Sequence, residues 1–319
     1  MCRSGRARDP FGMDNPRLRV SPLEPEPVLW YNGKNGGRGR DIPTGPRKRG
    51  GTMSMKRART IGFLGFGQMG SAIAAGLARF SPDAAEGRLR MTAWTPHPDR
   101  LRERIGDLPV VPCTSPEELA DSSDWLLLAV KPYQAESAAA GIRDRLAGKA
   151  VISVVNAMGC ADLTKIFGPE VRVQYVMPNT PMRAGAGAAL FEEESTLTEE
   201  ERADAEELFS SVGAVIRLPG SQIKAAASIT GCGPAFFFMA AEALGDAGVK
   251  NGLKRADAYR LAAAVMTGAG RLMADTGAHP GELKDAVCSP GGTTIRGVAS
   301  LEEDGFRSAL IRAVDATLR

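Results

Sequence analysis

Two glycines and two threonines near the end of the chain, in the run Ser289–Ile295, are the residues whose types and spacing most suggest chemistry. Gly291 and Gly292 let the backbone turn sharply and approach a ligand without a Cβ in the way. Thr293 and Thr294 follow at the start of an apolar, helix-like pattern. Backbone N–H groups at a helix start favour a carboxylate or a phosphate. The run therefore predicts an anion site, or else a plain glycine turn with a threonine helix cap.

A second glycine pattern, G-x-G-x-x-G, follows an apolar strand directly and opens a segment of helical period. In that context the first glycine permits the turn, and the second lets the backbone approach a pyrophosphate. The third glycine allows close packing of helix on strand. The pattern predicts a dinucleotide cofactor held by Gly65, Phe66, Gly67, Gln68, Met69 and Gly70.

The end of the next strand predicts which dinucleotide binds. An acidic residue there would bind the ribose 2′-hydroxyl and repel a 2′-phosphate. The chain has Thr95, Pro96 and His97 at this place, and the first acid is Asp99. Thr95 can donate to a phosphate, and His97 or Arg100 can add positive charge, although a histidine in such a loop is more often solvated than a ligand. We expect NADPH, with NADH as the alternative.

Three more loops contain candidate binding residues. The turn after the fourth predicted strand consists of Ala129, Val130, Lys131 and Pro132. It lies at the carboxyl ends of the strands, which form the ligand crevice. Prolines on both sides of Asn179 stiffen its loop and fix the direction of its amide. Cys232 lies in a glycine-rich break before an apolar helix. The alternative interpretations are a solvated lysine loop, a rigid connector and a simple helix break.

Histidine is scarce in this chain, which bears on the reaction. Hydride transfer to a carbonyl normally uses a proton donor poised near neutral pH, most often histidine. Only His97 and His279 are present, and His279 is expected to organise a turn. A cyclic imine that arrives protonated needs mainly binding, orientation and exclusion of water. The five cysteines show no metal-binding spacing, which favours free thiols, a reducing cytoplasmic compartment and no metal.

The elements that would position these residues change character along the chain. Residues 1–55 are rich in Pro, Gly and Arg and lack periodicity. We expect either that they are disordered or that translation starts later, at Met53 or Met55, and we favour the later start. From Thr60, apolar strands alternate with helices, including one predicted over Gln134–Leu146, as in a doubly wound parallel sheet. After about Ser221 the pattern is helical throughout. The predicted fold is an α/β Rossmann-type domain over 56–220, followed by an all-α domain over 221–319.

Composition and charge exclude several classes of function. The chain is 43% hydrophobic and 24% charged, as in an ordinary soluble protein. The formal net charge of +3 comes from the basic first 60 residues, and the remainder is acidic, so nothing in the body supports nucleic-acid binding. The longest apolar run, Ala235–Ala241, is interrupted by Glu242 and predicts a buried helix, with no membrane span.

Several of these motifs together resemble the pyrroline-5-carboxylate reductase family, over residues 60–319. The C-terminal run SPGGTTIRGVASLEEDGFR, with HPGELKDAV before it, is similar to the signature of that family, as are AVKP and MPNTP. The resemblance implies reduction of the C=N bond of pyrroline-5-carboxylate to L-proline, the last step of proline synthesis. It further implies that Gly291, Gly292, Thr293 and Thr294 hold the substrate carboxylate, and that the nicotinamide lies across Asn179 and the Cys232 turn. In the family the helical domains of two subunits interlock around the pocket, and rings of dimers also occur.

Four departures from the family pattern leave other functions open. The chain has Asn156 and Ala157 where the family has Ala-Gly beside the nicotinamide ribose, and Lys224 where Asp is common. Cys232 and Phe236 replace Ser and Tyr. The lost hydroxyls would suit another cyclic imine. Lys224 would suit a β-hydroxyacid dehydrogenase, although the Asn residues expected after it are missing. A non-catalytic NADP-binding sensor is the third alternative.

Overall fold

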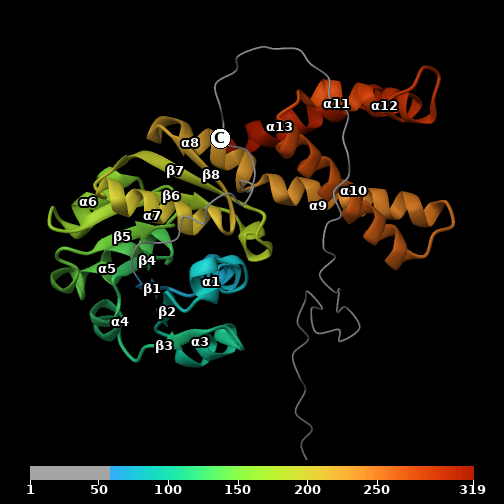
Figure 1. Cartoon of the computed structure of the whole chain (residues 1–319). Helices are drawn as coiled ribbons and strands as arrows, with labels where there is room; N and C mark the ends of the chain where they lie inside the picture. The colour runs from blue at the N-terminus through green and yellow to red at the C-terminus, as the bar shows by residue number, and fades with distance from the viewer. Residues whose placement is uncertain (1–57) are drawn as a thin grey trace, which may run out of the picture. The chain divides into compact units, whose positions relative to one another are not determined.

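The computed structural model describes residues 58–319, so the predicted N-terminal extension lies outside the described residues. Its centre is an eight-stranded sheet of order β3-β2-β1-β4-β5-β6-β7-β8 (Figure 1). This is the strand order of a dinucleotide-binding sheet with two strands added at one edge. The strands are β1 Arg59–Leu64, β2 Leu89–Trp94, β3 Val110–Pro112, β4 Trp125–Leu128, β5 Ala150–Ser153, β6 Arg172–Pro178, β7 Gly187–Ser195 and β8 Gly213–Leu218.

Helices connect the strands and then form the C-terminal part of the chain. Those of the sheet region are α1 Gln68–Phe80, α2 Pro82–Ala85, α3 Pro98–Ile105, α4 Pro116–Ser122, α5 Ala135–Ala140, α6 Cys160–Phe167 and α7 Glu199–Ser210, with 3₁₀ turns η1 Pro132–Gln134, η2 Arg143–Arg145 and η3 Thr180–Ala184. Beyond the sheet follow α8 Gly220–Thr230, α9 Gly233–Lys250, α10 Arg255–Thr276, α11 Pro280–Ala286, α12 Thr293–Glu303 and α13 Phe306–Leu318. The fold class is the predicted one, a Rossmann-type sheet followed by helices.

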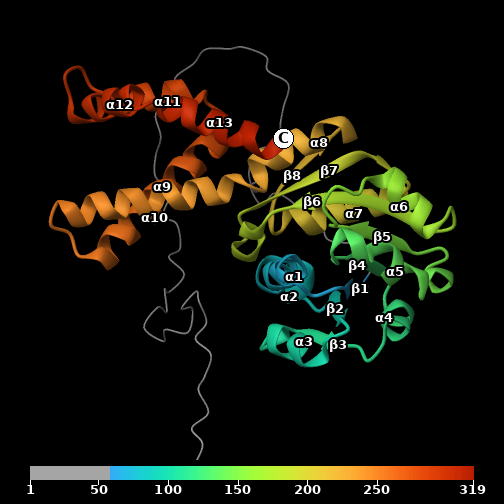
Figure 2. The ribbon, with the colours of Figure 1, turned by 180° about the vertical axis from the view of Figure 1, so that it is seen from behind.

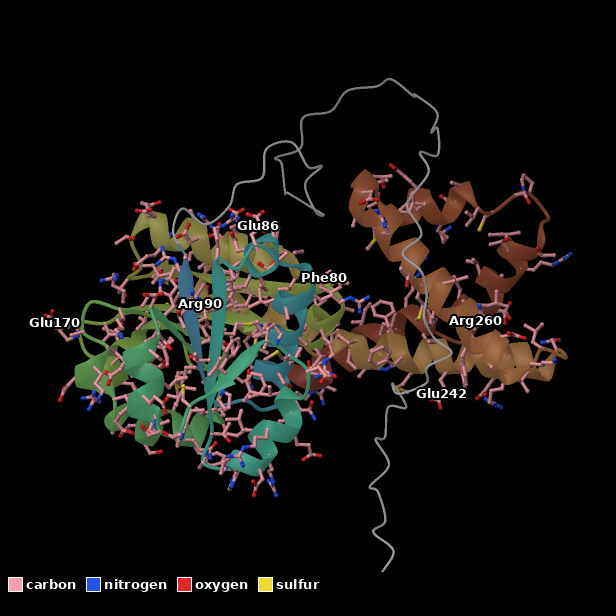
Figure 3. The ribbon with its side chains drawn as sticks, turned by 60° about the horizontal axis from the view of Figure 1, so that its bottom comes forward. Phe80, Glu86, Arg90, Glu170, Glu242 and Arg260 are labelled. Carbon is pink, nitrogen blue, oxygen red and sulfur yellow. The ribbon has the colours of Figure 1, made fainter. Side chains whose placement is uncertain are left out.

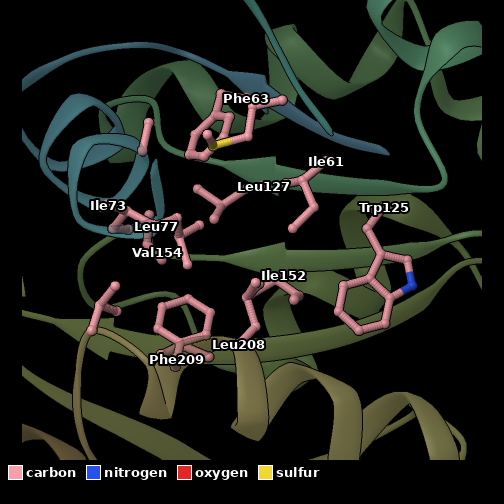
Figure 4. Packing of buried hydrophobic residues seen from close by; sticks show 14 of the residues in the cluster. Ile61, Phe63, Ile73, Leu77, Trp125, Leu127, Ile152, Val154, Leu208 and Phe209 are labelled. Atoms are coloured by element: carbon pink, nitrogen blue, oxygen red, sulfur yellow. The ribbon is translucent and has the colours of Figure 1, made fainter. Parts of the chain in front are cut away.

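The core lies on both faces of the sheet because successive strand side chains point to opposite sides. Ile61 and Phe63 of β1 pack on one face with α1, α3 and α7, as Figure 4 shows for α1 and α7. Leu64 packs on the other face with α4, α5, α6 and α8. Burial on both faces explains why the strands read as continuous apolar runs instead of alternating ones. Truncation of a core residue such as Leu77 to Ala is expected to cost roughly 2 to 5 kcal/mol.

Two sequence predictions about these elements are wrong. The sheet is not wholly parallel, because β7 pairs antiparallel with β6 and then parallel with β8. The connection between β6 and β7 is too short for a crossover, which needs a dozen or more residues. The helix predicted over Gln134–Leu146 is broken into η1, α5 and η2, since α5 ends at Gly141.

The long helices α9 and α10 form a closely packed pair. A Cβ built on Gly245 would lie 2.3 Å from the ring of Tyr259, and one on Gly248 would lie 2.9 Å from the Ala258 Cβ. The glycines therefore permit this close approach. Charged side chains such as Glu242 project from the outside of the pair (Figure 3).

Much of the apolar surface of the helical region is exposed in the single chain. Phe237, Phe238 and Met239 of α9 are each more than half exposed, as are Leu261 and Val265 of α10. The stretch Gly220–Lys250, which comprises α8 and α9, is also long and apolar enough by composition to cross a membrane, a test that the core helix of a soluble protein passes as well. No residue of α11, α12 or α13 is buried.

Candidate cofactor and substrate site

The glycine turn after β1 has the geometry that a dinucleotide requires. Gly65 has φ +91, and a Cβ there would lie 2.7 Å from the carbonyl oxygen of Ala129. Gly70 packs equally closely, since its Cβ would lie 2.8 Å from the Gly65 oxygen. Gly67 differs, because a Cβ on it would meet nothing within 4 Å. Two of the glycines are thus required by packing, and the third keeps open space beside the backbone.

The first turn of α1 can receive an anion. Gly67 is the N-cap of this helix, and no side chain caps its free amides. The first N–H groups of a helix have no partner within the helix, and the helix dipole favours negative charge there. The turn therefore fits the pyrophosphate of a dinucleotide, held by the backbone from Gly67 to Gly70.

The turn after β4 lies directly against the glycine turn. Ala129 N–H donates to the Leu64 carbonyl at 2.9 Å, and a Gly65 Cβ would also lie 2.9 Å from Val130 Cγ1. Lys131 and Pro132 are exposed, and the Lys131 amide donates to Gln134 Oε1 at 3.3 Å. The structure thus brings these two predicted segments together at one edge of the sheet.

At the end of β2, Thr95 and His97 form a small local turn. The Thr95 hydroxyl accepts from His97 N–H at 3.1 Å and donates to the His97 carbonyl at 3.2 Å. The nearest acid, Asp99, already belongs to α3, where it pairs with Arg102 at 3.4 Å. No carboxylate therefore stands at the end of β2 itself.

The segment after β5 contains a strained residue. Ala157 has φ +57, and it is the sole non-glycine residue with positive φ among residues 58–319. Such a conformation costs roughly 1 to 2 kcal/mol for an L-residue. Burial raises the pKa of the Tyr175 hydroxyl, and a hydrogen bond with the Ala157 backbone partly offsets that rise. Asn156, next to Ala157, is exposed beside the same strand end.

Asn179 is buried and both ends of its amide are in use. Its Nδ2 donates to the Thr230 carbonyl at 2.9 Å, and its Oδ1 accepts from Ala188 N–H at 2.8 Å. The side chain thus ties the loop after β6 to the last turn of α8. Cys232, two residues beyond Thr230, is half-buried at the N-cap of α9.

The glycine–threonine run has the predicted local structure but lies apart from the residues above. Gly291 has φ +68, and Gly292 is the N-cap of α12, which begins at Thr293. Thr293 and Thr294 are exposed, and no side chain caps this helix. In Figures 1 and 2, α12 lies away from the sheet. Within one chain, the structure therefore does not bring the run together with Asn179 or the glycine turn.

Sequence analysis missed two carboxylates that hold helix starts near this site. Glu192 Oε2 accepts from Cys160 N–H at 2.6 Å at the start of α6, and Glu194 Oε2 accepts from Gly220 N–H at 3.2 Å at the start of α8. Burial raises the pKa of the Cys160 thiol to about 12. In sequence the three consecutive glutamates of β7 are typical of a solvated strand edge. Among residues 58–319, no cluster of His, Cys, Asp or Glu could hold a metal ion.

Comparison with known proteins gives one consistent family. Residues 220–319 match the family model for pyrroline-5-carboxylate reductase dimerisation, and residues 60–157 match that for coenzyme F420-dependent NADP oxidoreductases. The pyrroline-5-carboxylate reductase of Treponema pallidum is 39% identical over 264 residues, which cover 81% of this chain and 98% of that protein. The Escherichia coli enzyme is 35% identical, over 80% of this chain and 94% of its own.

Solved structures agree. The pyrroline carboxylate reductase of Plasmodium falciparum with NADP bound has a TM-score of 0.71 and 30% identity, over 82% of this chain and 95% of that one. The Coxiella burnetii reductase has a TM-score of 0.72 and 29% identity, over 82% and 97%.

Proposed function

The chain belongs to the pyrroline-5-carboxylate reductase family, and from that membership we propose that it reduces pyrroline-5-carboxylate to L-proline. Two observations support the proposal. The chain matches 98% of the length of the Treponema pallidum reductase, and it retains the geometry of a dinucleotide-binding glycine turn. Bound NADPH would supply a hydride to the imine carbon. The imine nitrogen carries a proton and becomes the amine of proline, leaving NADP⁺.

The cofactor would lie along the carboxyl ends of β1, β2, β4 and β5. Backbone amides of the glycine turn would hold the pyrophosphate. We assign the rest of the cofactor surface to Thr95, His97, Ala129, Val130, Lys131, Pro132, Asn156 and Ala157. The preference for NADPH rests on the end of β2, where no carboxylate opposes a 2′-phosphate. The NADP-bound relative is in keeping with this preference.

The substrate carboxylate would be bound by the first turn of α12. Gly291 and Gly292 shape that turn, and the amides and hydroxyls of Thr293 and Thr294 would donate to the carboxylate. Asn179 and Cys232 would position the nicotinamide side of the pocket. No histidine lies among these residues, so the chain's part is to bind, orient and exclude water from an imine that arrives protonated.

A second copy of the chain would complete this pocket. The α12 turn lies apart from the cofactor residues of its own chain, and the matched dimerisation model covers the helical region. Exposed apolar residues of α9 and α10, with the groove lined by Leu244, Leu253 and Val265, would be buried between the copies. This explains the apolar surface without a membrane, so we propose a soluble cytoplasmic homodimer, able to form a ring of dimers.

This division of roles also sets the domain boundary. We propose that residues 56–220 bind the dinucleotide and that residues 221–319 bind the imine and dimerise.

The structure does not support the alternative function of a β-hydroxyacid dehydrogenase, because Lys224 donates to the Leu318 carbonyl at 3.0 Å. A side chain held in this way is poorly placed to move a substrate proton.

The test is oxidation of NADPH with pyrroline-5-carboxylate, beside NADH, a six-membered cyclic imine acid and a 3-hydroxy acid with NADP⁺. Turnover with the five-membered imine alone supports the proposal. Turnover with the larger imine, or with the hydroxy acid alone, would replace the substrate. Cofactor binding without any turnover would indicate a sensor.

The binding of the carboxylate is tested by Thr294→Ala. The Michaelis constant for the imine should rise about tenfold, as for a lost hydrogen bond to a charged group, while the affinity for NADPH stays constant. Thr276→Ala, at the end of α10, is the matched control and should leave both constants unchanged. Unaltered kinetics of Thr294→Ala would remove the α12 turn from the site.

A further inference from the structure

A single lysine links the first and last helices of the C-terminal region. Lys224 lies on the exposed side of α8, and its Nζ donates to the carbonyl oxygen of Leu318 at 3.0 Å. Leu318 is the last residue of α13, where the carbonyls lack partners within the helix. A lysine at a helix C-terminus binds these carbonyls and favours the negative end of the helix dipole.

The position of α13 depends on few other contacts within the chain. Helices α13 and α8 lie against each other, yet α13 contains no buried residue. Among residues 58–319, the Lys224–Leu318 bond is the hydrogen bond that joins these two helices. Loss of its charge is therefore expected to loosen the end of α13.

Movement of α13 would be passed on to α12, because only Asp304 and Gly305 separate the two helices. Gly305 turns the chain with φ +71, and Glu302 pairs with Arg307 across the corner at 2.5 Å. At 1.5 Å per residue, α13 is about 20 Å long, so a small tilt at its far end shifts the start of α12 by more than the tolerance of a hydrogen bond.

The other end of the same connection reaches the cofactor side. The last turn of α8 is held by Asn179, whose Nδ2 donates to the Thr230 carbonyl. A series of contacts thus runs from the loop after β6 through α8, Lys224 and α13 to the last turn of α12, and the Gly291–Thr294 turn lies at the other end of that helix.

We propose that Lys224 is a positioning residue for the reaction, which fixes α13 on α8 and thereby orients the Gly291–Thr294 turn that binds the imine carboxylate. This role rests on the proposed function. It assigns a purpose to a lysine at a position where the family commonly has Asp, since a carboxylate facing the carbonyl end of α13 would be repelled.

The test uses Lys224→Met, which removes the charge and keeps much of the length, with Lys224→Arg as the conservative variant. In the full-length protein, Lys224→Met should raise the Michaelis constant for the imine about threefold to tenfold, and NADPH affinity should stay within twofold. Lys224→Arg should keep the Michaelis constant for the imine at the value of the parent protein. Lys165→Met, which removes an exposed lysine of α6, is the control for loss of a charge and should change neither constant.

Amide hydrogen exchange gives a second readout that needs no turnover. Exchange in α13 and in the first turn of α12 should be faster in Lys224→Met and near normal in Lys224→Arg. Unchanged exchange in both helices would overturn the proposal, as would faster exchange with an unchanged Michaelis constant. If the parent protein does not reduce the imine, the proposed function fails, and protection of the α12 turn alone decides whether Lys224 orients it.

Discussion

Substitution of alanine for two glycines of the turn after β1 should impair different properties, namely stability at Gly65 and NADPH affinity at Gly67. In Gly65→Ala the new methyl would lie 2.7 Å from the Ala129 oxygen and 2.9 Å from Val130 Cγ1, at φ +91. The left-handed backbone costs roughly 1 to 2 kcal/mol for alanine, and overpacking costs about 1 to 3 kcal/mol. The free energy of unfolding should therefore fall by about 2 to 5 kcal/mol.

In Gly67→Ala the methyl meets open space, and φ −77 suits any residue. Alanine is a poorer N-cap than glycine, so the stability loss should stay below about 1 kcal/mol. That open space is where we place the pyrophosphate, so the affinity for NADPH should fall by at least about tenfold, or 1.4 kcal/mol.

The assay is urea unfolding of the sheet domain, followed by Trp fluorescence, beside NADPH titration of the folded protein. Gly268→Ala, at an unobstructed helical position of α10, is the control and should leave the affinity unchanged. A Gly65→Ala protein as stable as its parent would refute the packing argument. A Gly67→Ala protein with parental affinity would refute the place given to the pyrophosphate.

Three further substitutions or measurements test other features. Ala157→Gly removes about 1 to 2 kcal/mol of backbone strain and costs about 0.5 to 1 kcal/mol in the chain entropy lost on folding. Urea unfolding should therefore show a small rise in the free energy of unfolding, and a fall would contradict the strain at Ala157. Phe238→Glu places a charge on an exposed apolar side chain that we assign to the dimer, so ultracentrifugation should find monomers without imine turnover; an intact dimer would move the interface elsewhere. The Cys160 thiol, with a pKa of about 12, should resist thiol reagents at pH 8 until the chain unfolds. Because its folded pKa is raised above the ordinary value of 9.0, stability should also fall as pH rises from about 9 towards 12, and less so in Cys160→Ser.

Sequence alone predicted the backbone of the glycine turn well because the features there are local. The glycine turn is a strand, a tight bend and a helix within a dozen residues, so its backbone follows from neighbours in sequence. The turn at Ala129 was likewise predicted from its place after an apolar strand, and the structure places it against Gly65.

The features that sequence did not predict depend on contacts between distant segments. The side-chain amide of Asn179 forms hydrogen bonds with the backbone of Ala188 and Thr230, and no local sequence pattern predicts either partner. The partner of Lys224, the carbonyl of Leu318, lies 94 residues away in sequence, so no local pattern predicts their contact. The separation of the α12 turn from the sheet is also a property of the folded chain, which local periodicity does not predict.

The reversed strand β7 decides where the helical region begins. Because β7 and β8 run opposite to β6, β8 ends at the edge of the sheet where β6 starts, and its last residue pairs with Glu192. The eleven residues of α8 then travel back along the sheet, about 16 Å, and finish at Thr230 beside Asn179. An all-parallel sheet would have released the chain at the cofactor edge and sent this helix away from it. One antiparallel pairing thus brings the start of the helical region back to the end of β6, where Asn179 holds the last turn of α8.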